Sequence, residues 1–377
     1  YRLSQVHRLA PFFMTLRAQL CGLAPSFRDT PRAVIYTRGP DDPNYFEDAY
    51  LARYLGFTLV EGDDLTVRSS AVWLKTLDGL LPVDVVVRRP NSEACDPLEF
   101  TDRSNVGVAG LLHAERNGKV SVANVLGSGL VESPVFMAML PRLSKFFLQQ
   151  ELKLPGIATW WCGEEFSLSY VLENLDKLTV VAASRRRQAS HEADRQLNGL
   201  PVDELREKIR ADPAAYVAQQ RPLLSTAPAW HGGKSLALCH VVRAFAVAQD
   251  DSYLVMQGGL VRTSPVAAAD STTPLGRGCK DLWVLSSTPV GQVSLLPPRD
   301  DPLVIRRAGA DLPSRVAENL YWFGRQIERS DALARQLRTL VLRLTSETAD
   351  GGGDGAAPLL RALAAAGQLE PDYAVQE

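Results

Sequence analysis

Two adjacent arginines at the end of a strand-like run are the residues of this sequence with the plainest potential for chemistry. Arg88 and Arg89 close an apolar stretch, residues 83–88, whose β-branched residues predict a buried strand. Ligands of open α/β sheets bind at the carboxyl ends of the strands, and the guanidinium fork suits a carboxylate or a phosphate. Two interpretations stay open: the arginines bind an anionic ligand, or they are solvated or paired with Asp96 and Glu99 in the next loop.

A glycine-rich turn between a strand and a helix is the second candidate. Residues 120–126 read as a short buried strand, and Gly-Ser-Gly follows at 127–129. Ser133 and Pro134 then suit the N-cap and the first position of a helix. Glycine lets another group approach the backbone closely, and a helix N-terminus suits an anion. A turn without a ligand is the other interpretation, and Glu132 argues against a simple phosphate cradle.

Further polar residues lie within or beside later apolar runs. Arg243 lies inside the run 238–248, where a buried arginine needs a partner or a ligand because an unpaired buried charge is costly. Gly258 and Gly259 separate two strand-like segments, which predicts a hairpin or a tight bend. The other polar residues at the ends of strand-like runs are Gln219, which closes the run 215–219, and Lys280 and Asp281, which precede the run 282–285.

Composition limits the class of protein. The 377 residues suffice for two or three domains, and a hydrophobic content of 46% supports a large core. A net charge of −2 gives no sign of a nucleic-acid or anionic membrane partner, and no apolar run approaches the roughly 20 residues of a membrane helix. The five cysteines are scattered, so we expect reduced thiols and a cytoplasmic protein. The histidines do not join them at zinc-ligand spacing, and no structural metal site is predicted.

Hydrophobic periodicity divides the chain into an α/β body and a helical end. Residues 9–23 predict a helix, and short strands then alternate with helices. Residues 316–344 carry the clearest helical stripe, formed by Val316, Leu320, Phe323, Ile327, Leu333, Leu337, Leu340 and Leu344. One such helix cannot bury its own face, so we expect it to pack on the body, on a protein partner or second copy, or on helices outside this chain. A short alanine-rich helix is expected in the tail that follows.

Several ordered stretches together resemble one known family. They are YFEDAYLARYLG at 45–56, LVEGDDL at 59–65, VDVVVRR at 83–89, DPLE at 96–99, ANVLGSG at 123–129, TWWCG at 159–163 and MQGGL at 256–260. Over residues 7–345 the sequence resembles a bacterial circularly permuted ATP-grasp protein of type 2. The stretch AENLYWFGR at 317–325, with Glu328-Arg329 after it, resembles the start of an alpha-E domain.

The resemblance implies an α/β (α+β) fold that is ATP-grasp-like, with a Rossmann-like pre-ATP-grasp sheet and a C-terminal α-helical segment. The expected divisions are an N-terminal helical segment (1–30), the Rossmann-like domain (31–154), a partial ATP-grasp domain (155–295), a linker (296–312), the first alpha-E helix (313–349) and a flexible tail (350–377). It also implies an ATP-dependent carboxylate–amine ligase that uses ATP and Mg²⁺ and works through an acyl phosphate. The family is compared with glutathionylspermidine synthase, which implies a small-molecule or peptide-like substrate.

The resemblance also assigns site residues, although simple support of the fold is the other interpretation for each of them. The anion-facing, catalytic roles fall on Arg88, Arg89 and Arg243. Roles in the nucleotide cleft fall on Asn124, Gly127, Ser128, Gly129, Gln219, Gly258, Gly259, Arg262, Lys280 and Asp281. No metal ligand is assigned.

The sequence departs from the family pattern at points that matter for phosphate transfer. Val181-Ala182 stands where members carry a Lys-Pro pair whose lysine contacts the nucleotide phosphates, so the catalytic lysine is lost at Val181. Gln220 replaces an acidic residue after Gln219, and Gln257 replaces a proline. Since the chain opens with Tyr rather than Met, we expect an N-terminally truncated fragment that lacks part of the site. Weak or absent catalysis follows, with a non-catalytic scaffold that holds a partner through the C-terminal helix, or an inactive remnant, as alternatives.

Overall fold

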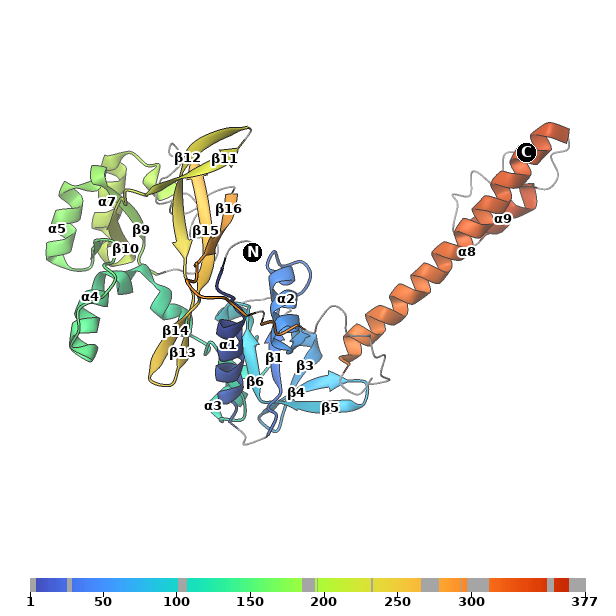
Figure 1. The fold of residues 1–377 in the computed structure, drawn as a ribbon, viewed down its shortest axis with the longest axis horizontal. Helices are drawn as coiled ribbons and strands as arrows, with labels where there is room; N and C mark the ends of the chain where they lie inside the picture. The colour runs from blue at the N-terminus through green and yellow to red at the C-terminus, as the bar shows by residue number, and fades with distance from the viewer. Residues whose placement is uncertain are drawn as a thin grey trace. The chain divides into compact units, whose positions relative to one another are not determined.

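The chain folds into two compact units, which are described separately (Figure 1). Unit 1 comprises residues 1–74 and 82–305, and unit 2 comprises residues 75–81 and 306–377. The computed structural model describes residues 5–25, 29–100, 107–184, 194, 196–231, 233–265, 278–291, 293–296, 312–350 and 356–365. The predicted linker lies almost wholly outside these residues.

Unit 1 begins with a four-stranded sheet in the order β2-β1-β6-β7, in which every pair of neighbours is parallel. The strands are β1 (Ala33–Tyr36), β2 (Thr58–Val60), β6 (Val85–Arg88) and β7 (Ser121–Ala123). All four residues of β1 are buried, as expected for a parallel sheet that is covered on both faces. β7 is shorter than the predicted strand 120–126, because the chain leaves the sheet at Asn124.

Short helical segments connect these strands, and the chain between β2 and β6 forms a separate antiparallel sheet. The helical segments are α2 (Tyr45–Leu55), α3 (Leu111–Arg116), η1 (Gly62–Asp64) and η2 (Ser92–Ala94). The antiparallel sheet has the order β3-β4-β5 and comprises β3 (Leu65–Arg68), β4 (Ala71–Thr76) and β5 (Gly79–Val83). Gly56 ends α2 with φ of 70°, a left-handed conformation that glycine adopts at little cost.

A second, smaller sheet carries helices on both faces. Its order is β8-β10-β9, formed by β8 (Thr159–Trp161), β9 (Leu178–Ala182) and β10 (Tyr216–Gln220). The helical segments around it are α4 (Pro134–Leu148), α5 (Glu165–Glu173), α7 (Val202–Ala211), η3 (Ser128–Glu132), η4 (Leu175–Lys177) and η5 (Pro213–Ala215). Val171 of α5 and Ile209 of α7 pack with Ala218 on one face. On the other face, Val135 of α4 packs against Val181.

The third sheet corrects three predictions about the later strands. Its order is β11-β12-β15-β16, formed by β11 (Thr226–His231), β12 (Lys234–Arg243), β15 (Gly258–Pro265) and β16 (Gly278–Trp283). The predicted hairpin at Gly258-Gly259 is wrong: these glycines begin β15, which pairs with β12 and β16, while β13 (Ala246–Gln249) pairs with β14 (Ser252–Val255).

The two other corrections concern charged residues of the same sheet. Lys280 and Asp281 lie inside β16 rather than ahead of a strand. Arg243 is the last residue of β12 and is exposed, because the strand ends there and the run 238–248 is not one strand. An exposed guanidinium keeps its hydration, so the expected need for a partner disappears.

Helix α1 (Ala10–Gly22) confirms the helix predicted at 9–23. Phe12 packs with Val247 and Met256 beside the β13–β14 hairpin. The Phe13 ring meets the Tyr54 ring of α2 edge-on, with centroids 5.1 Å apart. The helix therefore contacts both the first and the later parts of unit 1.

The segment that precedes α1 pairs with residues from the far end of unit 1. Val6 forms an antiparallel bridge with Leu285, and the His7 N–H donates to the Val284 carbonyl at 2.9 Å. The Val290 N–H donates to Gln5 Oε1 at 3.1 Å across 285 residues of sequence.

Unit 2 contains the long C-terminal helix α8 (Ser314–Asp350), which confirms the helix predicted over 316–344. Leu340 is buried against Leu363 of α9 (Ala356–Ala365), the short alanine-rich helix expected in the tail. Leu320, Phe323 and Ile327 are 57%, 64% and 53% exposed, so most of the predicted stripe is uncovered. No helix in the described part of the chain is both long and apolar enough to cross a membrane.

Gly259 is the glycine of the third sheet whose replacement should cost most. A Cβ on Gly259 would lie 2.5 Å from the Arg243 carbonyl oxygen of the neighbouring strand, where backbone cannot yield easily. We predict that Gly259→Ala lowers the free energy of unfolding by about 1–3 kcal/mol, measured by urea denaturation. Gly129→Ala is the control, because nothing lies within 4 Å of that Cβ position. Equal effects of the two substitutions would contradict this account.

Candidate functional site

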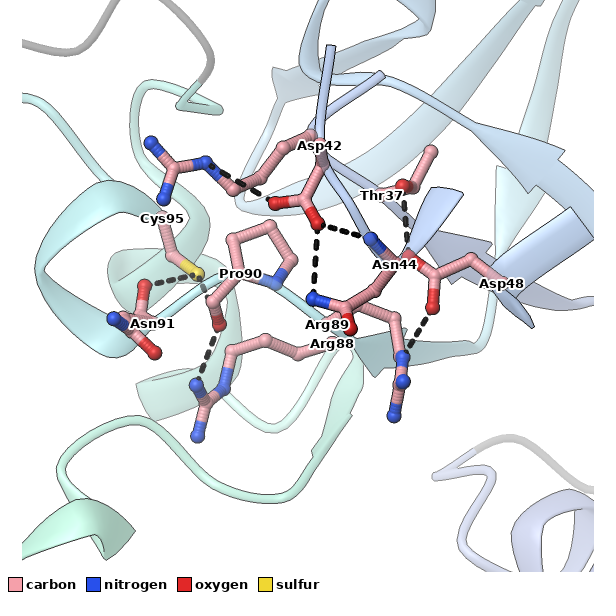
Figure 2. A network of polar contacts seen from close by, with 10 residues as sticks. Thr37, Asp42, Asn44, Asp48, Arg88, Arg89, Pro90, Asn91 and Cys95 are labelled. Atoms are coloured by element: carbon pink, nitrogen blue, oxygen red, sulfur yellow. Dashed lines mark hydrogen bonds and ion pairs between the residues drawn. The ribbon is translucent and has the colours of Figure 1, made fainter. Parts of the chain in front are cut away.

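A buried carboxylate anchors the carboxyl edge of the parallel sheet, as Figure 2 shows. Asp48 of α2 is 2% exposed. Thr37 Oγ1 donates to its Oδ2 at 2.8 Å, and Arg89 Nε donates to its Oδ1 at 2.5 Å. The backbone N–H of Arg89 also donates to the Tyr36 carbonyl at 3.0 Å. The residues that follow β1 and β6 are therefore held together by one carboxylate, and Arg89 is fixed at the edge.

Arg88 points to the loop that follows β7. Its Nε donates to the Asn124 carbonyl at 2.9 Å, its Nη1 to the Pro90 carbonyl at 2.7 Å and its Nη2 to Ser128 Oγ at 3.3 Å. The structure thus brings together three of the predicted site residues, Arg88, Asn124 and Ser128. All three guanidinium nitrogen atoms of Arg88 therefore donate to groups of the protein itself.

Asp96, the partner considered for the two arginines, has another role. Its carboxylate accepts the N–H groups of Leu98, Gly110 and Leu112 at 3.0–3.1 Å, which orders the start of α3. Asp96 therefore stabilises the backbone, and Arg89 pairs with Asp48 instead. Burial raises the pKa of the neighbouring Cys95 thiol to about 12, which keeps it protonated and unreactive near neutral pH.

A small hollow lies beside Asp48 at the same edge. Arg38, Asp42, Asn44, Asp48 and Arg89 line about 30 Å³, room for a group the size of one water. The backbone N–H and the side-chain amide of Asn44 both donate to Asp42 Oδ1, at 2.8 and 3.0 Å. Arg38 Nε lies 3.9 Å from Asp42 Oδ2. Two guanidinium groups and two carboxylates thus line a hollow that has room for one oxygen of an acid.

The backbone N–H groups of the glycine turn after β7 donate hydrogen bonds to other groups of the protein. Gly127 has φ of 89°, a left-handed conformation that explains glycine here. Its N–H donates to Ser92 Oγ at 3.1 Å, and the Ser128 N–H donates to the Val125 carbonyl at 3.1 Å. These two N–H groups are not directed at a ligand. Pro134 begins α4 as predicted, although the Ser133 side chain makes no capping hydrogen bond.

The third sheet holds a second group of predicted site residues. Directly paired residues of antiparallel strands share a face. Since Arg243 pairs with Leu260 and Leu260 with Asp281, while Arg262 pairs with Val241 and Cys279, Arg243, Arg262 and Asp281 lie on one face. Lys280 faces the opposite side, where its Nζ donates to the Pro228 carbonyl at 2.9 Å.

The paired glycines of β15 serve the fold through close contacts. A Cβ on Gly258 would lie 2.7 Å from Leu9 Cδ2. A Cβ on Gly259 would meet the Arg243 carbonyl, as described above. Other groups do approach these glycines closely, as expected, but they are the Leu9 side chain and the Arg243 carbonyl of this protein rather than a ligand.

Gln219 and the lost lysine position lie on the second sheet, on the face toward α4. Gln219 Nε2 lies 3.4 Å from Met137 Sδ. Val181 is 6% exposed and packs with Val217 and with Val135 of α4. A cation is absent at Val181, and the space around it is apolar.

The donor set fits nucleotide phosphates better than it fits magnesium. Arg262 Nε is buried and has no hydrogen-bond partner within the described residues, so an anion on this face would satisfy it. The exposed Arg243 lies diagonally across from it on the neighbouring strand. Over the described ranges, no three His, Cys, Asp or Glu side chains converge as a metal site. The cations described here therefore suit an anionic group such as a phosphate, and no ligand of Mg²⁺ is assigned among the described residues.

Sequence reasoning missed Thr37 and Asp48. Thr37 follows a buried strand in the same way as Arg89 does, which was a usable signal. Asp48 shares the buried face of α2 with Ala52 and Leu55, where a carboxylate is out of place unless it is paired.

Removing the Asp48 carboxylate should destabilise unit 1. We predict that Asp48→Ala lowers the free energy of unfolding by about 1–3 kcal/mol, because Thr37 and the partly exposed Arg89 lose their acceptor. The matched control is Asp203→Ala, whose carboxylate also lies 2.5 Å from an arginine but is 93% exposed. That loss should stay below about 1 kcal/mol. Urea denaturation measures both, and equal losses would show that burial at Asp48 is unimportant.

Comparisons with known proteins place this geometry in a family. Residues 1–264 match the family described as "Circularly permuted ATP-grasp type 2", and residues 312–377 match "Alpha-E", a predicted alpha-helical domain with a conserved ER motif. The uncharacterised protein Rv2567 of Mycobacterium tuberculosis is 34% identical over 332 residues, 87% of this chain and 37% of the relative. The uncharacterised protein sll0335 of Synechocystis is 32% identical over 270 residues, 71% of this chain and 56% of the relative.

The uncharacterised protein Rv2411c of Mycobacterium tuberculosis is 32% identical over 258 residues, 68% of this chain and 47% of the relative. The chain thus spans between 37% and 56% of the length of these relatives. The α/β architecture with its helical C-terminus agrees with the family match. The chain belongs to the circularly permuted ATP-grasp type 2 family, followed by an alpha-E domain.

Proposed function

We propose that this chain carries parts of the site of an ATP-dependent carboxylate–amine ligase. In this reaction a substrate carboxylate takes the γ-phosphoryl group of ATP to give an acyl phosphate, and an amine then displaces phosphate. The observation that carries the proposal is the common face of Arg243 and Arg262 on the third sheet, in a chain of the ATP-grasp family. Family membership supports a small-molecule or peptide-like acid as substrate.

In this proposal one group of residues binds ATP and another binds the acid substrate. Arg243 and Arg262 would neutralise the phosphates, where fixed cations stabilise the charge that builds up during transfer. Gln219 would lie near the adenine. Arg89 and Arg38 would orient the acid at the hollow beside Asp48, and the exposed Asn124 directly follows β7 at the same edge. Magnesium supplies charge neutralisation in such reactions, and its ligands are not assigned here.

We propose further that catalysis is impaired in this chain. Val181 offers no positive charge to the phosphates, and its contacts with Val135 and Val217 leave an apolar environment there. Loss of one stabilising donor costs about 3–4 kcal/mol in well-studied sites. A cytoplasmic location is part of the proposal, supported by five free cysteines that form no disulfide.

Nucleotide binding tests the proposal directly. We expect MgATP to raise the melting temperature of the purified chain, since a ligand at a hundredfold excess over its Kd adds about 2.7 kcal/mol of stability. Arg243→Ala should abolish the rise by removing a phosphate contact. Lys234→Ala, an exposed cation at the other end of β12, should preserve it. No rise at millimolar MgATP with a folded chain would end the proposal of nucleotide use by this chain alone.

The exposed stripe of α8 favours a second candidate, a scaffold that associates through this helix. Leu320, Phe323 and Ile327 recur at helical spacing and are all more than half exposed. An apolar stripe of this kind is stabilised by a second apolar surface. We propose a second copy of the same helix as its occupant, with a different protein as the alternative occupant.

Charge placed on the stripe should break self-association. We expect a concentration-dependent dimer in sedimentation equilibrium, and Phe323→Glu should weaken it at least about tenfold by burying a carboxylate in the contact. Gln326→Glu adds the same charge beside the stripe and should leave the dimer nearly unchanged. A chain that stays monomeric at high concentration would contradict self-association and leave a different protein as the occupant.

A further inference from the structure

A second hollow of unit 1, larger than the one beside Asp48, lies along helix α1. Its volume is about 450 Å³, which falls in the range of pockets that hold small organic molecules. Residues 293–295 form one wall, and the other is formed by Met14, Arg17, Ala18 and Cys21 of α1. None of these residues belongs to the ATP or acid sites proposed above, so the hollow is a separate feature of the protein.

The helical wall is the face of α1 that the core leaves open. Its four residues are spaced at i, i+3, i+4 and i+7, which places them on one face of the helix. Phe12 and Leu20, on the other side of the helix, are buried. Met14, in contrast, is 52% exposed, so its apolar surface is available to a ligand.

The second wall is placed by the pairing between the segment before α1 and residues 284–290. The Ser286 N–H donates to the Gln5 carbonyl at 2.7 Å, and the Gln5 side chain accepts the Val290 N–H. These contacts bring the chain that follows alongside α1. Val293 is 48% exposed and Leu295 is half-buried, so this wall also offers apolar surface.

Arg17 and Ser294 carry the strong hydrogen-bonding side chains of the hollow. Among the residues that the structure describes, none forms a hydrogen bond or an ion pair with the Arg17 guanidinium. Ser294 Oγ accepts the Leu296 N–H at 3.1 Å, which leaves the hydroxyl proton for another acceptor. Burial raises the pKa of the Cys21 thiol, and Arg17 opposes that rise only in part, so the thiol is neutral near neutral pH. Arg17 is thus the one charged group among the lining residues.

We propose that this hollow binds a small organic anion with an apolar body, such as a medium-chain carboxylate. Met14, Val293 and Leu295 would cover the apolar body, because removing apolar surface from water is favourable. Arg17 would bind the acid group through a charge-assisted hydrogen bond, and the Ser294 hydroxyl would donate to the same group. This site does not rest on the proposed ligase function.

Methyl NMR of the full chain with isotope-labelled methionine methyl groups tests the proposal, with octanoate as the probe. The sequence has four methionines, of which Met14 lines the hollow. We expect millimolar octanoate to shift the Met14 signal in a saturable way. Met137 of α4 is the internal control, because it is 44% exposed and reports association with apolar surface elsewhere. Its signal should stay in place.

Variants separate the contributions of charge and of space. Arg17→Gln should weaken octanoate binding about tenfold, the loss expected for one hydrogen bond to a charged group, and should leave the binding of neutral octanol unchanged. Arg17→Lys keeps the charge and should retain most of the affinity. Ala18→Trp fills the hollow and should weaken the binding of both probes. Arg53→Gln, which removes an exposed cation from α2, is the matched control and should change neither.

Three results would overturn the proposal. A Met14 signal that does not move with millimolar octanoate would exclude binding in the hollow. Equal shifts at Met14 and Met137 would indicate general association with exposed apolar surface. Equal affinity of Arg17→Gln and the unchanged chain for octanoate would show that the hollow does not select an anion. The MgATP titration has its own outcome, so the failure of either proposal leaves the other standing.

Discussion

The pairing of the buried Asp48 carboxylate with Thr37 and Arg89 is the interaction on which the carboxyl edge of the parallel sheet depends. Asp48 is shielded from water, and a buried charge is tolerated only when hydrogen bonds and an opposite charge offset its desolvation. Its partners follow the neighbouring strands β1 and β6. Because the parallel register brings Tyr36 beside Arg88, Thr37 and Arg89 reach the same carboxylate. The strand register thus brings the two partners to Asp48, and their contacts with Asp48 in turn stabilise that register.

The two adjacent arginines show how one strand end serves two purposes. Successive side chains of an extended chain point to opposite sides. Arg89 turns to α2 and Arg88 turns to the loop after β7. Arg89 meets the Asp48 carboxylate, and Arg88 meets two carbonyl groups and the Ser128 hydroxyl. The donors of both arginines are therefore used largely within the protein, and at the hollow beside Asp48 the cations Arg38 and Arg89 are matched by Asp42 and Asp48.

The sequence was most informative where burial follows a simple period. The parallel strands, α1 and the long α8 were predictable because apolar residues recur at the spacing of one face. Gly258 and Gly259 were taken as a possible hairpin turn, because glycine marks close backbone approach as well as turns; the alternative of a bend holds at Gln257, just before β15. The site was predictable only in part. Arg88 and Arg89 were visible at a strand end, but their partners Asp48 and Ser128 come from segments that only the folded chain brings near.

The pairing of residues near Val6 with residues near Leu285 also has a consequence for biosynthesis. A chain is made from its N-terminus, and contacts between distant segments cannot form until both segments have left the ribosome. The first segment of unit 1 must therefore stay without its native partner while almost all of the unit is being translated. Phe12 of α1 also lacks its native partners during the same interval, because Val247 and Met256 come late. The newly made chain thus depends on protection from aggregation until the unit can close.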